Sequence, residues 1–121
     1  MRPIVIIMED EADSRDWLVE ALTSEGYDVL CAANGADGLA RLATLPTRAS
    51  LVLLDMRMPV MNGWDVLAAL ARFRPRPPVV IITADNQVHG VPAGAEAVLM
   101  KPLHVADLLE VVRRHAACPA A

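Results

Sequence analysis

Five short runs of apolar residues recur along the 121-residue chain, and they restrict its fold more than any other feature. The runs span residues 4–8, 27–32, 51–54, 79–83 and 97–100. Most of them are apolar at nearly every position, as strands of a parallel sheet are when helices cover both faces. The pattern therefore predicts five parallel strands, of which the run at 27–32 carries the weakest signal.

Longer amphipathic stretches separate most of these runs and predict helices. They lie at about residues 14–25, 36–45, 64–71 and 105–112. Gly26 stands where a helix C-terminal cap is expected, and Pro46 ends the second stretch. Alternating strands and helices of this length predict a single α/β domain over residues 1–121, built as a doubly wound five-stranded parallel sheet.

The segment between the fourth and fifth runs differs from the others. Gly90, Pro92 and Gly94 interrupt it, and it has no convincing apolar stripe. We therefore expect the fourth helix to be short or irregular.

Charge and composition exclude several classes of protein. Eleven Lys and Arg against fifteen Asp and Glu give a net charge of −4, which provides no basic surface for direct nucleic-acid binding. The apolar run from Pro3 to Met8 is too short for the core of a signal peptide, and no run reaches the length of a membrane span. Cys31 and Cys118 have neither metal-binding nor redox spacing, so a cytoplasmic location is expected.

Polar residues stand at the ends of four predicted strands, where parallel sheets bind ligands. They are Glu9 and Asp10 after the first strand, Asp55 after the third, Thr83 at the end of the fourth and Lys101 after the fifth. If the first and third strands are neighbours, three carboxylates converge, with a hydroxyl and an ammonium facing them. Hard oxygen ligands of this kind suit Mg²⁺.

With the metal bound, Asp55 can attack a phosphoryl donor while Lys101 and Thr83 stabilise charge on the phosphoryl oxygens. Each residue alone has an ordinary explanation, as a first-turn acid, a strand-end threonine or a solvated lysine. Only their combined placement indicates phosphoryl chemistry.

The motifs resemble those of the response-regulator receiver family. They are Glu-Asp-Glu at 9–11, Asp-Met-Arg-Met-Pro at 55–59 with Gly63, Thr-Ala at 83–84 and Lys-Pro at 101–102. The resemblance covers essentially the whole chain and implies a flavodoxin-like sheet of strand order 2-1-3-4-5.

The resemblance also implies the roles of the site residues. Asp55 would be the phosphorylated residue, with Asp10, Glu9 and the backbone carbonyl of Arg57 around Mg²⁺. Thr83 and Lys101 would sense the phosphoryl group. A histidine kinase or histidine phosphotransfer protein would be the donor, and an unidentified output protein would receive the signal. Such a domain catalyses only its own phosphorylation and dephosphorylation, so we do not expect an enzyme acting on other substrates.

Three departures from the family pattern concern signal transmission more than chemistry. Val98 occupies the position where the family usually has an aromatic residue, and the interval from Thr83 to Lys101 is about one helical turn short. Glu9 replaces the commoner aspartate. The usual relay from threonine to aromatic residue therefore cannot operate in its standard form.

Other functions remain open at this point. A degenerate receiver would bind partners without phosphorylation, and an aspartyl-phosphate phosphatase would use a similar Asp, Thr and Lys set. Such phosphatases need an acid two residues after the nucleophile, where Arg57 stands here.

No linker or output domain follows the last helix, so a stand-alone receiver is expected. Arg57 and Asp85 lie on facing loops. They are either two solvated charges or an ion pair, and our hypothesis is a pair that restricts water and tunes the lifetime of the phosphoryl group.

Overall fold

The computed structural model describes residues 2–45, 49–86 and 88–117. In chain order, the elements are β1 (Ile4–Met8), α1 (Ala12–Thr23), β2 (Asp28–Ala32), α2 (Gly35–Thr44), β3 (Leu51–Asp55), α3 (Gly63–Leu70), β4 (Val79–Thr83), β5 (Ala97–Met100) and α4 (Val105–His115). Each predicted strand and helix is present to within a few residues. Pro46, predicted to end the second helix, and Cys118 lie outside the described residues.

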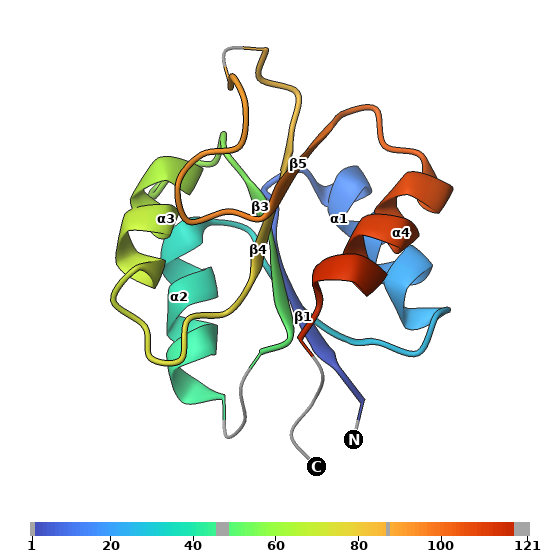
Figure 1. Cartoon of the computed structure of the whole chain (residues 1–121), viewed down its shortest axis with the longest axis horizontal. Coiled ribbons are helices and arrows are strands. Elements are labelled where there is room, and N and C mark those ends of the chain that lie inside the picture. Colours follow the sequence, from blue (N-terminus) through green and yellow to red (C-terminus); the bar gives the residue numbers. More distant parts are fainter. Residues whose placement is uncertain (1, 46–48, 87, 118–121) are drawn as a thin grey trace.

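The five strands form one parallel sheet of order β2-β1-β3-β4-β5, which confirms the predicted fold. Helices α2 and α3 cover one face of the sheet and α1 and α4 cover the other (Figure 1). The side chains of β3 and β4 are buried at every position because both strands lie in the interior of this three-layer arrangement. The core therefore consists of two apolar layers, one on each side of a rigid sheet.

Two asparagines fix the starts of the helices on the first of these faces. The side-chain oxygen of Asn34 accepts a hydrogen bond of 2.8 Å from the Asp37 N–H at the start of α2, and Asn62 accepts one of 3.0 Å from Asp65 at the start of α3. These bonds satisfy backbone donors that a helix start leaves unpaired. The cap at Asn62 also fixes where the loop after β3 turns into α3.

The connection from β4 to β5 contains no helix among its described residues, 84–86 and 88–96, as the sequence predicts for a short or irregular fourth helix. Gly90 and Gly94 have φ values of 68° and 94°, a left-handed conformation that ends regular helix. Strand β5 is less covered than the central strands, and Met100 at its end is 46% exposed. The connection from β4 to β5 follows an irregular path on the α3 side of β5 (Figure 1).

The helices among the described residues are short. None of them is both long enough and apolar enough to span a lipid bilayer.

Candidate functional site

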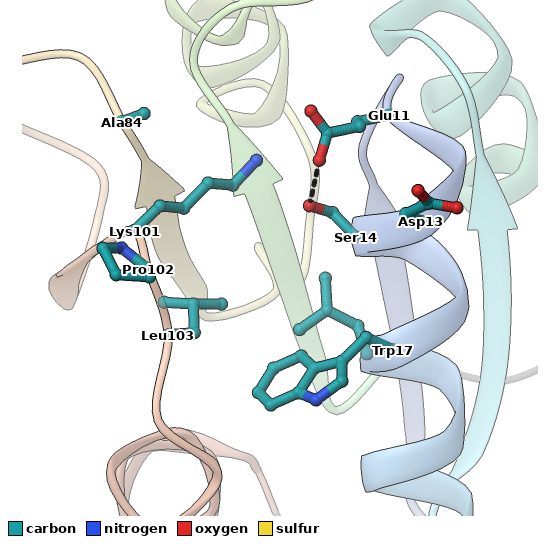
Figure 2. A pocket seen from close by; sticks show the side chains of 9 residues that line it. Glu11, Asp13, Ser14, Trp17, Ala84, Lys101, Pro102 and Leu103 are labelled. Atoms are coloured by element: carbon teal, nitrogen blue, oxygen red, sulfur yellow. Dashed lines mark hydrogen bonds between the residues drawn. The ribbon is translucent and has the colours of Figure 1, made fainter.

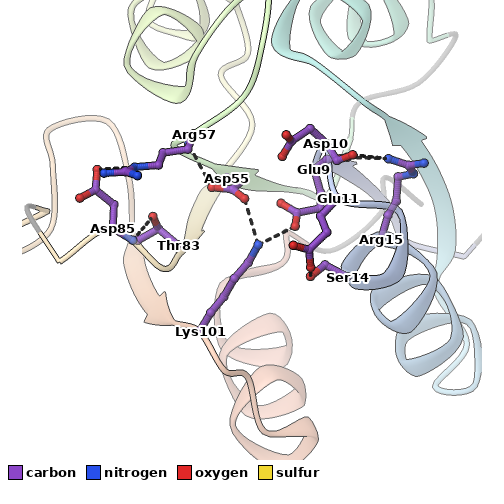
Figure 3. Close-up of polar contacts among 10 residues, drawn as sticks. All are labelled: Glu9, Asp10, Glu11, Ser14, Arg15, Asp55, Arg57, Thr83, Asp85 and Lys101. Carbon is purple, nitrogen blue, oxygen red and sulfur yellow. Dashed lines mark hydrogen bonds and ion pairs between the residues drawn. The ribbon is translucent and has the colours of Figure 1, made fainter.

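The carboxyl ends of β1, β3, β4 and β5 bring the predicted residues to one edge of the sheet (Figure 3). Asp55 and Thr83 are the last residues of β3 and β4, while Glu9 and Lys101 directly follow β1 and β5. Pairing of β1 with β3 places the acidic pair beside Asp55. The first and third strands are therefore neighbours, as the predicted convergence of Glu9, Asp10 and Asp55 requires.

Lys101 joins two carboxylates across this edge. Its Nζ lies 2.5 Å from Glu9 Oε1 and 3.0 Å from Asp55 Oδ2, and only 19% of its side chain is exposed. Glu9 is fully buried and Asp55 is 6% exposed. An ammonium shared between two buried carboxylates offsets part of their mutual repulsion and holds the Asp55 side chain in one orientation.

Burial shifts the protonation of this cluster. Loss of hydration, reinforced by the neighbouring Asp55 carboxylate and opposed by Lys101, raises the pKa of Glu9 from 4.5 to about 7. Burial alone would lower the pKa of Lys101, but its hydrogen bonds to Glu9 and Asp55 outweigh that effect and raise it. Lys101 therefore stays charged, and Glu9 is the group whose charge is costly in the absence of a further cation.

The backbone of the two adjacent loops orients the other polar groups. The Arg57 N–H donates a 3.0 Å hydrogen bond to Asp55 Oδ1, so one oxygen of the carboxylate is held by the loop and the other by Lys101. The Asp85 N–H donates a 3.0 Å bond to the Thr83 hydroxyl oxygen in the same i to i+2 pattern. The Thr83 hydroxyl is thus fixed by its own loop at the buried end of β4.

Arg57 and Asp85 form the predicted ion pair between these loops. Arg57 Nε lies 3.4 Å from Asp85 Oδ2, and the arginine side chain is 75% exposed while that of the aspartate is 16% exposed. The geometry of the prediction is confirmed. Its predicted effect on phosphoryl lifetime stays a prediction.

Three carboxylates at this edge could hold a cation. Ligand oxygens from Glu9, Asp10 and Asp55 lie within 4.8 Å of one another. Glu9 Oε2 is buried and has no hydrogen-bond partner within the described part of the chain, an unfavourable state that a cation or its bound water would relieve. An all-oxygen, incomplete set of this kind fits Mg²⁺. The predicted role of the Arg57 carbonyl as a further ligand stays a prediction.

Gly63 shapes the loop that carries the site. Its N–H donates a 3.0 Å bond to the Met56 carbonyl. A Cβ atom at this position would come within 2.6 Å of Met56 Cα and 2.9 Å of the Asp55 carbonyl oxygen. Both are backbone atoms next to the phosphoacceptor candidate, so the motif requires glycine for close approach of α3 to the loop.

Sequence reasoning missed the role of Arg15. Its guanidinium donates to the backbone carbonyls of Glu9 and Asp10, at 2.9 and 3.3 Å, and so fixes the turn between β1 and α1 (Figure 3). An arginine in the first turns of a helix that follows an acidic strand end could have pointed to this contact. The contact orients the backbone that presents both acids.

Two cavities meet at Lys101. A space of about 350 Å³ is lined by Asp10, Glu11, Asp55, Arg57, Ala84 and Lys101. Glu11, Ala84 and Lys101 also line a second space of about 510 Å³, which extends between α1 and the connection from β5 to α4 (Figure 2). There Trp17 on α1 lies across from Leu103. The first cavity is polar and exposes Asp55, and the second provides an approach to it.

The geometry agrees with the comparisons to known proteins. A family model described as the response regulator receiver domain matches residues 5–113. This chain belongs to the response regulator receiver family. Its strand order, acidic cluster and strand-end lysine now have a common explanation, since they are the parts of a receiver domain.

Curated relatives are transcriptional regulators. HprR of Escherichia coli K12 is 33% identical over 113 residues, covering 90% of this chain and 49% of that protein. PrrA of Mycobacterium tuberculosis is 35% identical over 115 residues, covering 92% of this chain and 48% of that protein. The chain thus spans about half the length of the curated relatives it matches.

Solved structures show the same fold. A CheY-like receiver domain from Methanospirillum hungatei JF-1 superimposes with a TM-score of 0.84 at 28% identity, covering 94% of this chain and 93% of that one. TrrA of Thermotoga maritima, solved in complex with Mg²⁺ and a beryllium fluoride, has a TM-score of 0.82 at 26% identity, with coverage of 94% and 98%.

Proposed function

We propose that this receiver domain accepts a phosphoryl group on Asp55 in a Mg²⁺-dependent reaction and signals through altered contacts with a partner. One observation carries the proposal: the nearly buried Asp55 carboxylate faces a polar cavity with Lys101 3.0 Å from one of its oxygens. A carboxylate held in this way can act as a nucleophile whose product is stabilised in place.

In the proposed transfer, an Asp55 oxygen forms a bond to phosphorus as the bond from phosphorus to the donor nitrogen or oxygen breaks. The electron pair of the broken bond leaves with the donor, which takes a proton from solvent. Lys101 donates to the developing charge on the phosphoryl oxygens, and the Thr83 hydroxyl donates from the neighbouring strand. The Arg57 N–H keeps the second Asp55 oxygen in place during the transfer.

Glu9, Asp10 and Asp55 would hold the Mg²⁺ ion, with the Arg57 carbonyl as a further ligand. The cation supplies charge neutralisation for the incoming phosphoryl oxygens and lets three neighbouring carboxylates stay ionised. Glu9 Oε2, which is buried and has no hydrogen-bond partner among the residues that the structure describes, supports this assignment. The complex of the similar TrrA protein with Mg²⁺ and a beryllium fluoride also supports it.

Receiver domains of response regulators interact with histidine kinases and output domains, so the phosphoryl donor would be a histidine kinase or a histidine phosphotransfer protein. The output partner is a separate protein or a further part of a longer chain. We propose a cytoplasmic location and no enzymatic activity beyond the domain's own phosphorylation and dephosphorylation.

Incubation with acetyl phosphate and Mg²⁺, followed by intact-mass measurement, tests the proposal. We expect the mass of one phosphoryl group on the wild type and none on Asp55→Asn, which keeps the shape and hydrogen-bonding capacity of the side chain. Removing Mg²⁺ with EDTA should abolish the increase in mass. An unmodified wild type, or equal modification of Asp55→Asn, would contradict the proposal. Continued release of phosphate from a monoester such as p-nitrophenyl phosphate would contradict the absence of enzymatic turnover.

A further inference from the structure

Arg57 lies between two cavities on the surface of the site. It lines the polar cavity that exposes Asp55, and it also lines a neighbouring space of about 580 Å³ that is bordered by Asp85 and Trp64. Asp85 borders only the second of these spaces. The residue thus lies at a boundary: its guanidinium pairs with Asp85, and its backbone lies beside the phosphoacceptor (Figure 3).

The backbone of Arg57 stays close to the reacting group whichever way its side chain points. Its N–H is 3.0 Å from Asp55 Oδ1, and its side chain is long and 75% exposed. A rotation about side-chain bonds, with no movement of the loop, can therefore turn the guanidinium from Asp85 toward a group attached to Asp55.

The two possible partners differ in strength. The contact with Asp85 joins Nε to a single carboxylate oxygen at 3.4 Å. Because the arginine side chain is 75% exposed, water screens the pair even though the aspartate side chain is only 16% exposed. A phosphoryl group on Asp55 would carry nearly two negative charges and three acceptor oxygens, to which arginine can donate two parallel hydrogen bonds. Phosphorylation therefore favours exchange of partners.

The change of partner by Arg57 would act on the connection from β4 to β5. Asp85 belongs to the connection from β4 to β5, whose described residues 84–86 and 88–96 contain two backbone–backbone hydrogen bonds among themselves, Val88 to Asp85 and Ala95 to Pro92. A segment with so little regular hydrogen bonding depends on ties to its neighbours and opens at low cost in free energy. The Arg57 ion pair is one such tie.

We propose that Arg57 is a second phosphoryl-binding side chain, which leaves Asp85 when Asp55 is phosphorylated and thereby loosens the β4–β5 segment. This inference rests on the proposed function of Asp55. It provides a route for the signal that does not use an aromatic residue on β5, where this chain has Val98. Arg57 would join Lys101 and Thr83 at the phosphoryl group, and Asp85 would compete for it.

If Asp85 and the phosphoryl group compete for Arg57, then removing Arg57 and removing the charge of Asp85 should have opposite effects on the affinity for a phosphoryl analogue. Beryllium fluoride, added with Mg²⁺, serves as this analogue. Arg57→Ala removes a phosphoryl-binding group and should weaken binding by about three- to tenfold. Asp85→Asn removes the competitor and should tighten binding by about two- to fivefold. Arg72→Ala, an exposed arginine just beyond α3, is the matched control and should leave the affinity unchanged. Tryptophan fluorescence gives the affinity.

Hydrogen exchange of residues 88–96 gives a second readout. Beryllium fluoride should speed exchange of this segment in the wild type and not in Arg57→Ala. If Arg57→Ala and Asp85→Asn change the affinity for beryllium fluoride in the same direction, the ion pair has only a structural role and the inference is overturned. An unchanged rate of hydrogen exchange in residues 88–96 of the wild type on addition of beryllium fluoride would also overturn it. If the wild type takes neither beryllium fluoride nor a phosphoryl group from acetyl phosphate, the proposed function itself fails and this inference fails with it.

Discussion

Replacing Glu9 by Gln isolates the free-energy cost of one buried charge. Glu9 is fully buried, its Oε2 lacks a hydrogen-bond partner within the described residues, and its pKa rises from 4.5 to about 7. The folded state therefore keeps a proton that the unfolded chain releases, so Glu9 lowers stability as the pH rises from 4.5 through 7. Gln has nearly the same shape and still offers an oxygen to Lys101, but it carries no charge.

The difference in free energy of unfolding between the two proteins cancels the contribution of titrating groups that do not interact with Glu9. The pKa of Glu9 rises from 4.5 to about 7, and each pKa unit corresponds to about 1.36 kcal/mol. Between pH 5 and pH 8, the free energy of unfolding of the wild type should therefore fall by roughly 2–3 kcal/mol relative to that of Glu9→Gln. Most of the loss should be complete near pH 7. Saturating Mg²⁺ should remove much of it, because the cation stabilises the ionised carboxylate.

Urea unfolding in EDTA at pH 5, 6, 7 and 8, followed by circular dichroism, measures the free energy of unfolding of both proteins. Glu20→Gln, at an exposed carboxylate on α1, is the control and should follow the wild type at every pH. A stability difference between wild type and Glu9→Gln that does not change with pH would refute the reasoning, and one that changes with the opposite sign would refute it as well.

Two further predictions concern the loop and the metal. Gly63→Ala should lower the free energy of unfolding by about 2–3 kcal/mol, because the added Cβ meets the Met56 and Asp55 backbone within 2.9 Å. Gly90→Ala should lower the free energy of unfolding by only about 1–2 kcal/mol, because nothing lies within 4 Å of the added Cβ and only the left-handed backbone is unfavourable. Equal losses for Gly63→Ala and Gly90→Ala in urea unfolding would contradict this prediction. Mg²⁺ at a hundred times its dissociation constant should stabilise the wild type by about 2.7 kcal/mol, and Asp10→Asn should lose most of that gain in the same assay. Equal stabilisation of both proteins would place the cation elsewhere.

The alternation of apolar runs and amphipathic stretches is sufficient to predict a five-stranded parallel α/β sheet, while the strand order follows from the resemblance to the receiver family. Buried parallel strands are apolar on both faces, so their positions can be read without knowledge of their partners. The break in the fourth unit was also visible, since Gly90, Pro92 and Gly94 act through local backbone preferences. Site residues could be named because ligands bind where parallel strands end.

The contacts among those residues depend on the tertiary structure. Lys101 meets Glu9 across 92 positions of sequence and Asp55 across 46, and such distances are closed only by the order of strands in the sheet. Arg15 holds the β1–α1 turn through the backbone carbonyls of Glu9 and Asp10, a contact that its position in the first turns of α1 only suggests.

The sequence by itself therefore determined the fold class and the chemical groups at the site, because both follow from local patterns. The tertiary structure alone decided that Glu9 is buried, with one oxygen that has no hydrogen-bond partner among the described residues. It also decided that the Arg57 backbone holds Asp55 while the Arg57 side chain makes the predicted pair with Asp85. Burial arises from segments distant in the chain, and it sets the pKa of Glu9.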